Sequence, residues 1–212
     1  MQKNTIYIVL GVVALSLLLM FASQYLTEKS VSGTVGALSA TDHIDGNKDA
    51  KTVLIEYGDY QCPACASYDP MVAQVVADLG QDIAFSFRHF PLQQHGQALL
   101  AAYAAEAAGV QGKFWEMHAK LYENQTVWAG QANARDLFIS FAKDLGLDVQ
   151  KFQNDLDSQT IKEKVQSDLT GGRTAGVDAT PTFYINGKKV SSTPQNAEEF
   201  KALLKPYGAQ AQ

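Results

Sequence analysis

The sequence predicts an α/β domain that carries an inserted helical domain and follows one N-terminal transmembrane helix. Three observations predict this class. An uncharged apolar stretch opens the chain, short strand patterns occur on both sides of the central region, and the central region, about residues 96–170, is helical in character. We therefore divide the 212 residues into a transmembrane anchor over 1–26, a flexible linker over 27–50 and an α/β domain over 51–212.

The N-terminal stretch is long enough to cross a bilayer. Residues 6–26 carry no charge, and a membrane-spanning helix needs about 20 apolar residues. A cleaved signal peptide is the alternative, but small residues at cleavage-site spacing occur only well downstream, at 30–32 and 37–39. A buried core helix is disfavoured because the stretch is apolar on all sides and terminal. Whether the segment is cleaved stays open.

Charges near the apolar stretch indicate which side of the membrane the domain occupies. Lys3 precedes the stretch, which favours an N-terminus inside the cell and a domain outside it. We expect a single-pass protein of the cell membrane whose domain lies in the periplasm or on the outer face, where disulfides persist.

The composition behind the anchor excludes one class of partner. The residues after position 26 include 16 basic and 22 acidic side chains, a net charge of −6. Nucleic-acid binding requires a basic face, so we expect no nucleic acid as a partner. The linker is rich in Ser, Gly, Thr, Asp and Ala, which is typical of a flexible tether.

A strand, a helix and a second strand open the α/β domain. Residues 53–57 form a nearly continuous apolar run, as expected for a strand covered on both faces. The following helix has Pro63 in its first turn, apolar residues at helical spacing, and Gly80 at its end. Residues 83–89 alternate in character, which predicts the second strand.

The central region is expected to be largely helical. Apolar residues recur at helical spacing in successive segments separated by glycine or capping residues. The predicted helices are 98–108, 113–123, 134–145, a short helix capped by Asp148, and a helix around 161–169 that ends before Gly171 and Gly172.

A hairpin and a helix complete the domain. Asn186 and Gly187 lie between two short strand patterns within 183–190, which is a strong hairpin signal. A final helix is predicted over about 196–206, because Asn196 and Glu199 have capping-box spacing.

The two cysteines of the chain, Cys62 and Cys65, form a CxxC motif between a predicted strand and a predicted helix. This placement is typical of redox-active thiol pairs. A structural disulfide is disfavoured, because closing so short a loop removes little chain entropy. A zinc site would need two more ligands, and the histidines lack paired spacing: His43, His89, His95 and His118. We therefore expect a redox-active Cys62–Cys65 disulfide, with no other cofactor and no metal.

The order of these elements and three motifs resemble the DsbA-like thiol oxidoreductases, especially their membrane-tethered forms. The motifs are EYGDYQCPAC at 56–65, FRHFPL at 87–92 and TPT at 180–182. The resemblance covers about residues 50–210, and three motifs in the same order are far more specific than CxxC alone. It implies a thioredoxin fold whose connecting helix is enlarged into a helical domain.

The resemblance assigns roles to three residues near the motif. Cys62 would be the nucleophile, at a helix N-terminus that favours a thiolate, and Cys65 the resolving thiol. Glu56 would lie beneath the disulfide and shuttle the proton of Cys65. A carboxylate in an apolar strand is costly unless it has a role, although a strand-end carboxylate that reaches water is the alternative.

We expect the substrate to bind around Pro63, Ala64, Thr180 and Pro181. Thr180 and Pro181 resemble the cis-proline loop that faces the disulfide in this family and pairs with an extended substrate; an ordinary strand-entry proline is the alternative. Family members often have histidine before the second cysteine. Ala64 stands there in this chain, so we expect a less acidic Cys62 and a less strongly oxidising pair.

The resemblance implies an enzyme, a protein thiol:disulfide oxidoreductase that introduces disulfides into exported proteins. It also implies reoxidation by a quinone-linked membrane protein, near which the anchor would hold the domain. We expect a monomer whose substrates are unfolded or reduced exported proteins. A reductase or isomerase of the same fold, and a non-catalytic adaptor, remain alternatives.

Overall fold

The computed structural model describes residue 16 and residues 36–209. The chain divides into two units, and the second, Val35–Gln212, contains the α/β domain. Apart from residue 16, the predicted transmembrane anchor over 1–26 lies outside the described residues. Within the described part of the chain, no helix combines the length and the apolar character that crossing a membrane requires.

A five-stranded sheet in the order β1-β3-β2-β4-β5 forms the centre of the domain. Strands β2 and β3 are parallel, and the other neighbouring pairs are antiparallel. The parallel pair is connected by helix α2, Pro63–Leu79. The strands are β1 Ile44–Gly46, β2 Thr52–Gly58, β3 Ile83–His89, β4 Thr182–Ile185 and β5 Lys188–Lys189.

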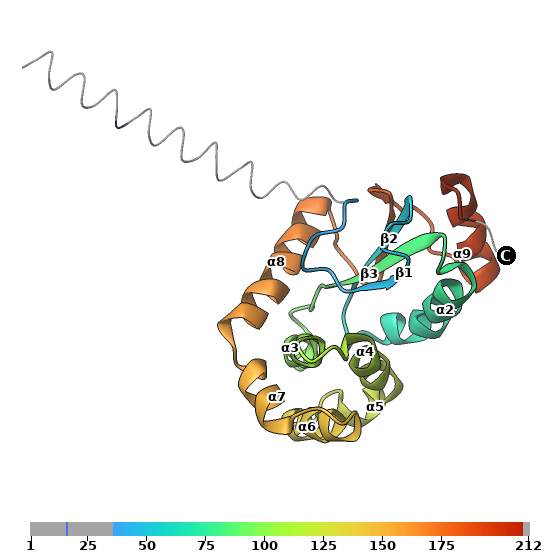
Figure 1. Cartoon of the computed structure of the whole chain (residues 1–212). Coiled ribbons are helices and arrows are strands. Elements are labelled where there is room, and N and C mark those ends of the chain that lie inside the picture. Colours follow the sequence, from blue (N-terminus) through green and yellow to red (C-terminus); the bar gives the residue numbers. More distant parts are fainter. Residues whose placement is uncertain (1–15, 17–35, 210–212) are drawn as a thin grey trace, which may run out of the picture. The chain divides into compact units, whose positions relative to one another are not determined.

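The helices between β3 and β4 confirm the predicted helical insertion. Figure 1 shows α3 to α7 grouped beside the sheet, with α8 leading back toward it. These helices are α3 Ala98–Gly109, α4 Phe114–Glu123, α5 Gln125–Trp128, α6 Ala134–Asp144, α7 Val149–Leu156 and α8 Gln159–Ala175, and α9 Ala197–Leu204 follows the hairpin.

Different helices cover the two faces of the sheet. Leu54, Phe85 and Phe183 belong to one buried cluster together with residues of α2, α4 and α9. Ile55 and Tyr184 belong to a second cluster, against which Leu169 of α8 packs. Successive residues of a strand point to opposite faces, so the nearly continuous apolar run of β2 contributes to both clusters.

Residues 36–50, the described part of the predicted linker, belong to the fold. The sequence predicted a flexible tether over 27–50, of which 27–35 lie outside the described residues, yet β1 pairs with β3. Asp42 accepts hydrogen bonds from Nε and Nη2 of Arg88 at 3.1 and 2.7 Å, and the carbonyl of Ala37 accepts another from Nη2 at 2.8 Å. The buried guanidinium requires these partners, so the polar composition reflects turns and a buried ion pair.

Helix α8 continues through Gly171 and Gly172, where the sequence predicted its end. A Cβ on Gly172 would lie 2.6 Å from Cδ2 of Phe90 and 2.9 Å from Cδ1 of Tyr57. Glycine therefore stands at position 172 because the helix touches the sheet there. The helix ends instead at Gly176, which has a left-handed φ of 83°.

The C-terminal predictions are confirmed. Asn186 and Gly187 have φ values of 45° and 80° and join β4 to β5. The side chain of Asn196 accepts a hydrogen bond from the backbone N–H of Glu199 at 2.9 Å, and α9 begins at the next residue, Ala197.

Candidate active site

The CxxC motif lies at the start of α2, directly after the turn that follows β2. Cys62 is the N-cap residue, and Pro63 occupies the first turn. Both cysteines are free thiols in this structure. Cys62 is 7% exposed and Cys65 is fully buried, whereas Pro63 and Ala64 between them are exposed. A reacting group can therefore approach Cys62 but not Cys65.

The surroundings of Cys62 favour its thiolate. A hydrogen bond from the Cys65 thiol lowers the pKa of Cys62 to about 5, assisted by Thr180 and by the backbone N–H groups of Ala64 and Cys65, and opposed by partial burial. When protonated, the Sγ of Cys62 donates to the carbonyl of Thr180 at 3.4 Å. Cys62 is consequently a thiolate at neutral pH.

The thiol of Cys65 is a much weaker acid than the thiol of Cys62. Burial raises the pKa of its thiol, and the hydrogen bond that it donates to Cys62 and the charge of Glu56 raise it further. The pair therefore consists of one thiolate and one neutral thiol. This asymmetry assigns nucleophilic attack to Cys62 and makes Cys65 dependent on a proton donor or acceptor nearby.

Glu56 is a buried carboxyl group in β2, on the same sheet face as the redox pair. It is 3% exposed, so the alternative of a carboxylate that reaches water is wrong. Burial raises its pKa well above the ordinary value, and the charges of Asp69 and Cys62 add to this effect. The raised pKa favours the neutral acid, which is the form that a proton donor must have before the sulfur of Cys65 leaves.

The loop before β4 completes the site. The Thr180–Pro181 peptide bond is cis, as predicted, and the loop lies against Cys62 through the carbonyl of Thr180. The Oγ1 of Thr180 is buried without a hydrogen-bond partner among the described residues. The predicted substrate-side residues Pro63, Ala64, Thr180 and Pro181 thus surround Cys62 from two distant parts of the chain.

Gln125 of α5 holds the turn that carries Cys62, a role that no motif in the sequence indicated. Its buried amide nitrogen donates to the carbonyl of Tyr60 at 2.8 Å and to that of Cys62 at 3.0 Å. The carbonyl of Cys62 also accepts from the backbone N–H of Ala66 at 3.2 Å, so Gln125 adds a second hydrogen bond at the first turn of α2. The helical insertion therefore fixes the backbone of the redox motif.

Asp59 holds the same turn from the other side. Its Oδ1 accepts from the backbone N–H of Gln61 at 2.7 Å, and its Oδ2 from the N–H of Leu92 at 2.9 Å and from Nδ1 of His95 at 2.7 Å. Asp59 is 2% exposed, so these hydrogen bonds are buried. His95 supports the site through Asp59.

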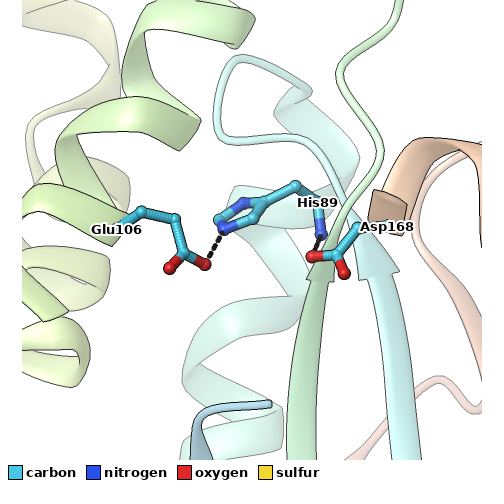
Figure 2. A group of neighbouring side chains, drawn as sticks. All are labelled: His89, Glu106 and Asp168. Atoms are coloured by element: carbon cyan, nitrogen blue, oxygen red, sulfur yellow. Dashed lines mark hydrogen bonds and ion pairs between the residues drawn. The ribbon is translucent and has the colours of Figure 1, made fainter. Parts of the chain in front are cut away.

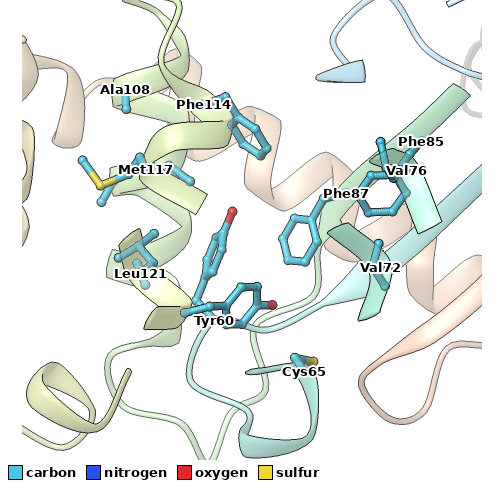
Figure 3. Close-up of a cluster of buried hydrophobic side chains, with 14 of the residues drawn as sticks. Tyr60, Cys65, Val72, Val76, Phe85, Phe87, Ala108, Phe114, Met117 and Leu121 are labelled. Atoms are coloured by element: carbon cyan, nitrogen blue, oxygen red, sulfur yellow. The ribbon is translucent and has the colours of Figure 1, made fainter. Parts of the chain in front are cut away.

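A buried polar chain runs from the redox motif into the helical insertion. The hydroxyl of Tyr60 lies 3.0 Å from Nδ1 of His118, and Nε2 of His118 lies 2.9 Å from Oδ1 of Asp69. Tyr60 also packs against Phe87 at a centroid distance of 5.0 Å. Figure 3 shows Tyr60, Phe87 and Cys65 in one buried cluster.

A second polar cluster lies around His89, Glu106 and Asp168 (Figure 2). Nε2 of His89 lies 2.8 Å from Glu106, and the backbone N–H of His89 donates to Asp168 at 3.1 Å. These side chains are of metal-ligating types within reach of one another. However, the ammonium group of Lys164 lies 2.6 Å from Asp168 and 3.8 Å from Glu106.

A cation thus already occupies this cluster. Burial would raise the pKa of Glu106, but hydrogen bonds from His43 and His89 hold it well below the ordinary value. The cluster ties β3 to α3 and α8 as an ion network. His95 and His118 have carboxylate partners of their own, Asp59 and Asp69. Each of the four histidines therefore interacts with a carboxylate group rather than with the two thiols.

Comparison with known proteins identifies similar sequences and folds. A family model described as Thioredoxin matches residues 38–206. The Na(+)/H(+) antiporter NhaA 1 of Salinispora arenicola is 38% identical over 149 residues, which are 70% of this chain and 22% of that protein. The antiporter NhaA of Herminiimonas arsenicoxydans is also 38% identical, over 70% of this chain and 23% of that protein. The chain spans about a quarter of the length of such relatives.

Solved structures share the fold over most of their length. BdbD from Bacillus subtilis, in its oxidised form, matches with a TM-score of 0.69 and 26% identity, over 78% of this chain and 92% of that one. α-DsbA1 of Wolbachia pipientis matches with a TM-score of 0.71 and 20% identity, over 81% and 93% of the two chains. A thioredoxin-like oxidoreductase from Silicibacter pomeroyi matches with a TM-score of 0.67 and 22% identity, over 79% and 92%.

Proposed function

The chain belongs to the thioredoxin family and is a DsbA-like thiol-disulfide oxidoreductase with a CxxC pair, and from that premise we propose that it oxidises thiols of exported proteins outside the cytoplasm. One observation carries the direction of this proposal. Cys62 has a pKa of about 5 while the pKa of Cys65 is raised. A stabilised thiolate favours the reduced pair, so the disulfide form is readily reduced by other thiols.

The reaction that fits this geometry has two steps. A substrate thiolate attacks Sγ of Cys62 in the disulfide, and the sulfur of Cys65 leaves with the electron pair and takes the proton of Glu56. A second substrate thiol loses its proton to solvent, and its thiolate attacks the substrate sulfur of the mixed disulfide and releases Cys62 as its stabilised thiolate. The substrate gains a disulfide, and both protein cysteines end reduced.

The partners and the location are proposed from the sequence. The uncharged stretch over 6–26 and Lys3 before it support a tether with the domain on the outer side of the cell membrane. A tether would raise the effective concentration of the domain near a quinone-linked membrane protein that reoxidises the pair. We propose that the chain acts there as a monomer on unfolded or reduced exported proteins.

The reduction potential of the Cys62–Cys65 pair tests the direction. Known pairs of this kind range from about −270 mV for a reductase to about −120 mV for a strong oxidase. We expect the full-length chain, equilibrated with glutathione buffers, to have a potential above about −200 mV. Such a chain should also oxidise a reduced, unfolded protein in stoichiometric amounts.

The alternatives give different results in the same measurement. A potential near about −270 mV would show a reductase. An adaptor would neither exchange disulfides with glutathione nor react with alkylating agents at Cys62. The Cys62→Ser variant is the control, because it keeps the fold and lacks the nucleophile.

A further inference from the structure

The hydroxyl group of Tyr122 is buried and has no hydrogen-bond partner among the described residues. Tyr122 lies near the end of α4 and is 6% exposed. Buried hydroxyl groups almost always form a hydrogen bond, because an unpaired one loses the bonds that water would supply. A phenol left without a partner therefore suggests an acceptor that is present at another stage of the reaction.

The neighbours of Tyr122 do not use its hydroxyl. Its ring packs against Tyr60, His118 and Phe87 at centroid distances of 4.9, 5.1 and 6.2 Å. The hydroxyl of Tyr60 is paired with Nδ1 of His118, whose other ring nitrogen is paired with Asp69. The polar atoms of Tyr60 and His118 are thus already engaged with each other and with Asp69.

The same packing places Tyr122 in the buried cluster that contains the redox pair. Phe87, which its ring contacts, is the register partner of Glu56 in the parallel pair β2 and β3, so both side chains lie on one sheet face. A Cβ on Gly58 would lie 2.2 Å from Cε2 of Phe87 and 3.0 Å from Oε1 of Glu56, which places the Phe87 ring and the carboxyl group around the same glycine. Cys65 belongs to the same buried cluster as Phe87 and Tyr122.

The chain just after Tyr122 also contacts the motif. Gln125, three residues later, donates to the carbonyl of Cys62 at 3.0 Å. Burial raises the pKa of the Tyr122 phenol, and the charges of Cys65 and Glu56 raise it further. The phenol therefore stays protonated and can only donate toward these two groups.

We propose that the Tyr122 hydroxyl donates a hydrogen bond to the sulfur of Cys65 when that sulfur leaves as a thiolate. This inference rests on the proposed function. A substrate thiolate forms a bond to Sγ of Cys62, the Cys62–Cys65 bond breaks, and its electron pair goes to the sulfur of Cys65. The hydrogen bond from Tyr122 stabilises that charge until Glu56 gives up its proton to it and becomes the carboxylate.

The reduced structure explains why the hydroxyl is unpaired. The neutral Cys65 thiol donates to Cys62, and a neutral sulfur is a weak acceptor. A charged sulfur accepts a much stronger hydrogen bond. The interaction is therefore stronger in the transition state than in the resting states, and only such an interaction accelerates a reaction.

The Tyr122→Phe variant of the full-length chain tests the proposal. In the oxidised protein, we expect reduction by excess glutathione to be about tenfold slower than in the parent, a change of about 1.4 kcal/mol in the barrier. Alkylation of Cys62 by iodoacetamide in the reduced protein should keep the parent rate, since Cys65 does not leave in that reaction. The melting temperature should not fall, because the hydroxyl has no hydrogen bond to lose.

Tyr60→Phe is the matched control, because it removes a paired hydroxyl from the same aromatic cluster. If the oxidised Tyr122→Phe variant were reduced at the parent rate, the proposal would be overturned. Equal slowing in Tyr122→Phe and Tyr60→Phe would also overturn it, because the effect would then come from packing of the aromatic cluster. An equal slowing of alkylation and reduction in Tyr122→Phe would overturn it too. If oxidised parent protein failed to react with glutathione, the proposed function itself would fail.

Discussion

Cys62 and Cys65 show how position alone separates two identical side chains. Cys62 is at the N-terminus of α2, where Cys65, Thr180 and backbone N–H groups stabilise its negative charge. Cys65, one turn further, is fully buried, and burial together with the charge of Glu56 raises the pKa of its thiol. One sulfur is thus prepared to attack or be attacked, and the other must exchange its proton inside the protein.

Replacing Glu56 by glutamine should remove the proton donor while keeping the size and shape of the side chain. We expect Glu56→Gln to slow the reaction of the oxidised pair with a thiol by about tenfold or more, as is typical when a general acid is lost. The neutral amide should also make the folded protein more stable at pH 7. The pKa of Glu56 is raised by folding, so its contribution to stability falls as the pH rises above the ordinary carboxyl value toward the folded value.

Quenched-flow trapping of the mixed disulfide measures the rate, and urea unfolding measures the stability. Glu116→Gln is the matched control, because Glu116 is an exposed acid on α4 paired with Lys113. Unchanged kinetics of Glu56→Gln from pH 5 to pH 8 would remove the assigned role.

Among the elements, those set by local pattern were predicted and those set by distant contacts were not. The strand and helix periodicities, the Asn186–Gly187 turn and the cap at Asn196 are local signals, and the structure confirms them. Strand β1 and helix α5 have only three and four residues, too few for a periodic pattern. Pairing with β3 defines β1, and the contact with the redox motif defines α5.

The candidate site divides in the same way. Cys62, Cys65, Glu56 and the Thr180–Pro181 bond could be predicted because motifs mark them. Gln125 donates to a carbonyl 63 residues away in the sequence, and no pattern within α5 encodes such a contact. The buried chain through His118 likewise depends on packing between α2 and α4.

For α8, the two adjacent glycines offer an internal comparison. Gly172→Ala should destabilise the protein by about 1–3 kcal/mol, because the new methyl group would overlap the rings of Phe90 and Tyr57. Gly171→Ala should instead be neutral or stabilise the protein by up to about 1 kcal/mol, since its nearest neighbour would be the hydroxyl of Tyr57 at 3.7 Å. Urea unfolding of both variants gives the comparison, and equal effects would show that α8 does not press on the sheet at 172.

At the scale of the whole molecule, the stability difference between the redox forms should depend on pH. Folding lowers the pKa of Cys62 from an ordinary 9.0 to about 5. Between these values the unfolded reduced chain binds more protons than the folded one, so the free energy of unfolding rises with pH. The oxidised form lacks this thiol. The reduced-minus-oxidised difference should therefore increase by about 1.4 kcal/mol per pH unit between about pH 5 and pH 8, and this contribution is lost as the pH falls through 5.

Urea unfolding of both redox forms across this range measures the difference. The raised pKa of Cys65 keeps that thiol protonated in the folded protein. The charge of Cys62 also raises the pKa of Glu56, so both redox forms are measured in the Glu56→Gln background, where the slope belongs to Cys62. The Cys62→Ser variant should lose the slope. A flat difference in the Glu56→Gln background would contradict the acidity assigned to Cys62.

The contact between Cys62 and the loop at Thr180 also has a consequence during biosynthesis. The two residues are 118 positions apart, and a ribosome adds about 5–20 residues per second. The loop therefore emerges on the order of ten seconds after the motif. Until then Cys62 lacks the partner that completes its surroundings and behaves more like an ordinary thiol. The order of synthesis thus delays full reactivity until the substrate-binding side of the site exists, which limits unwanted exchange with other nascent chains.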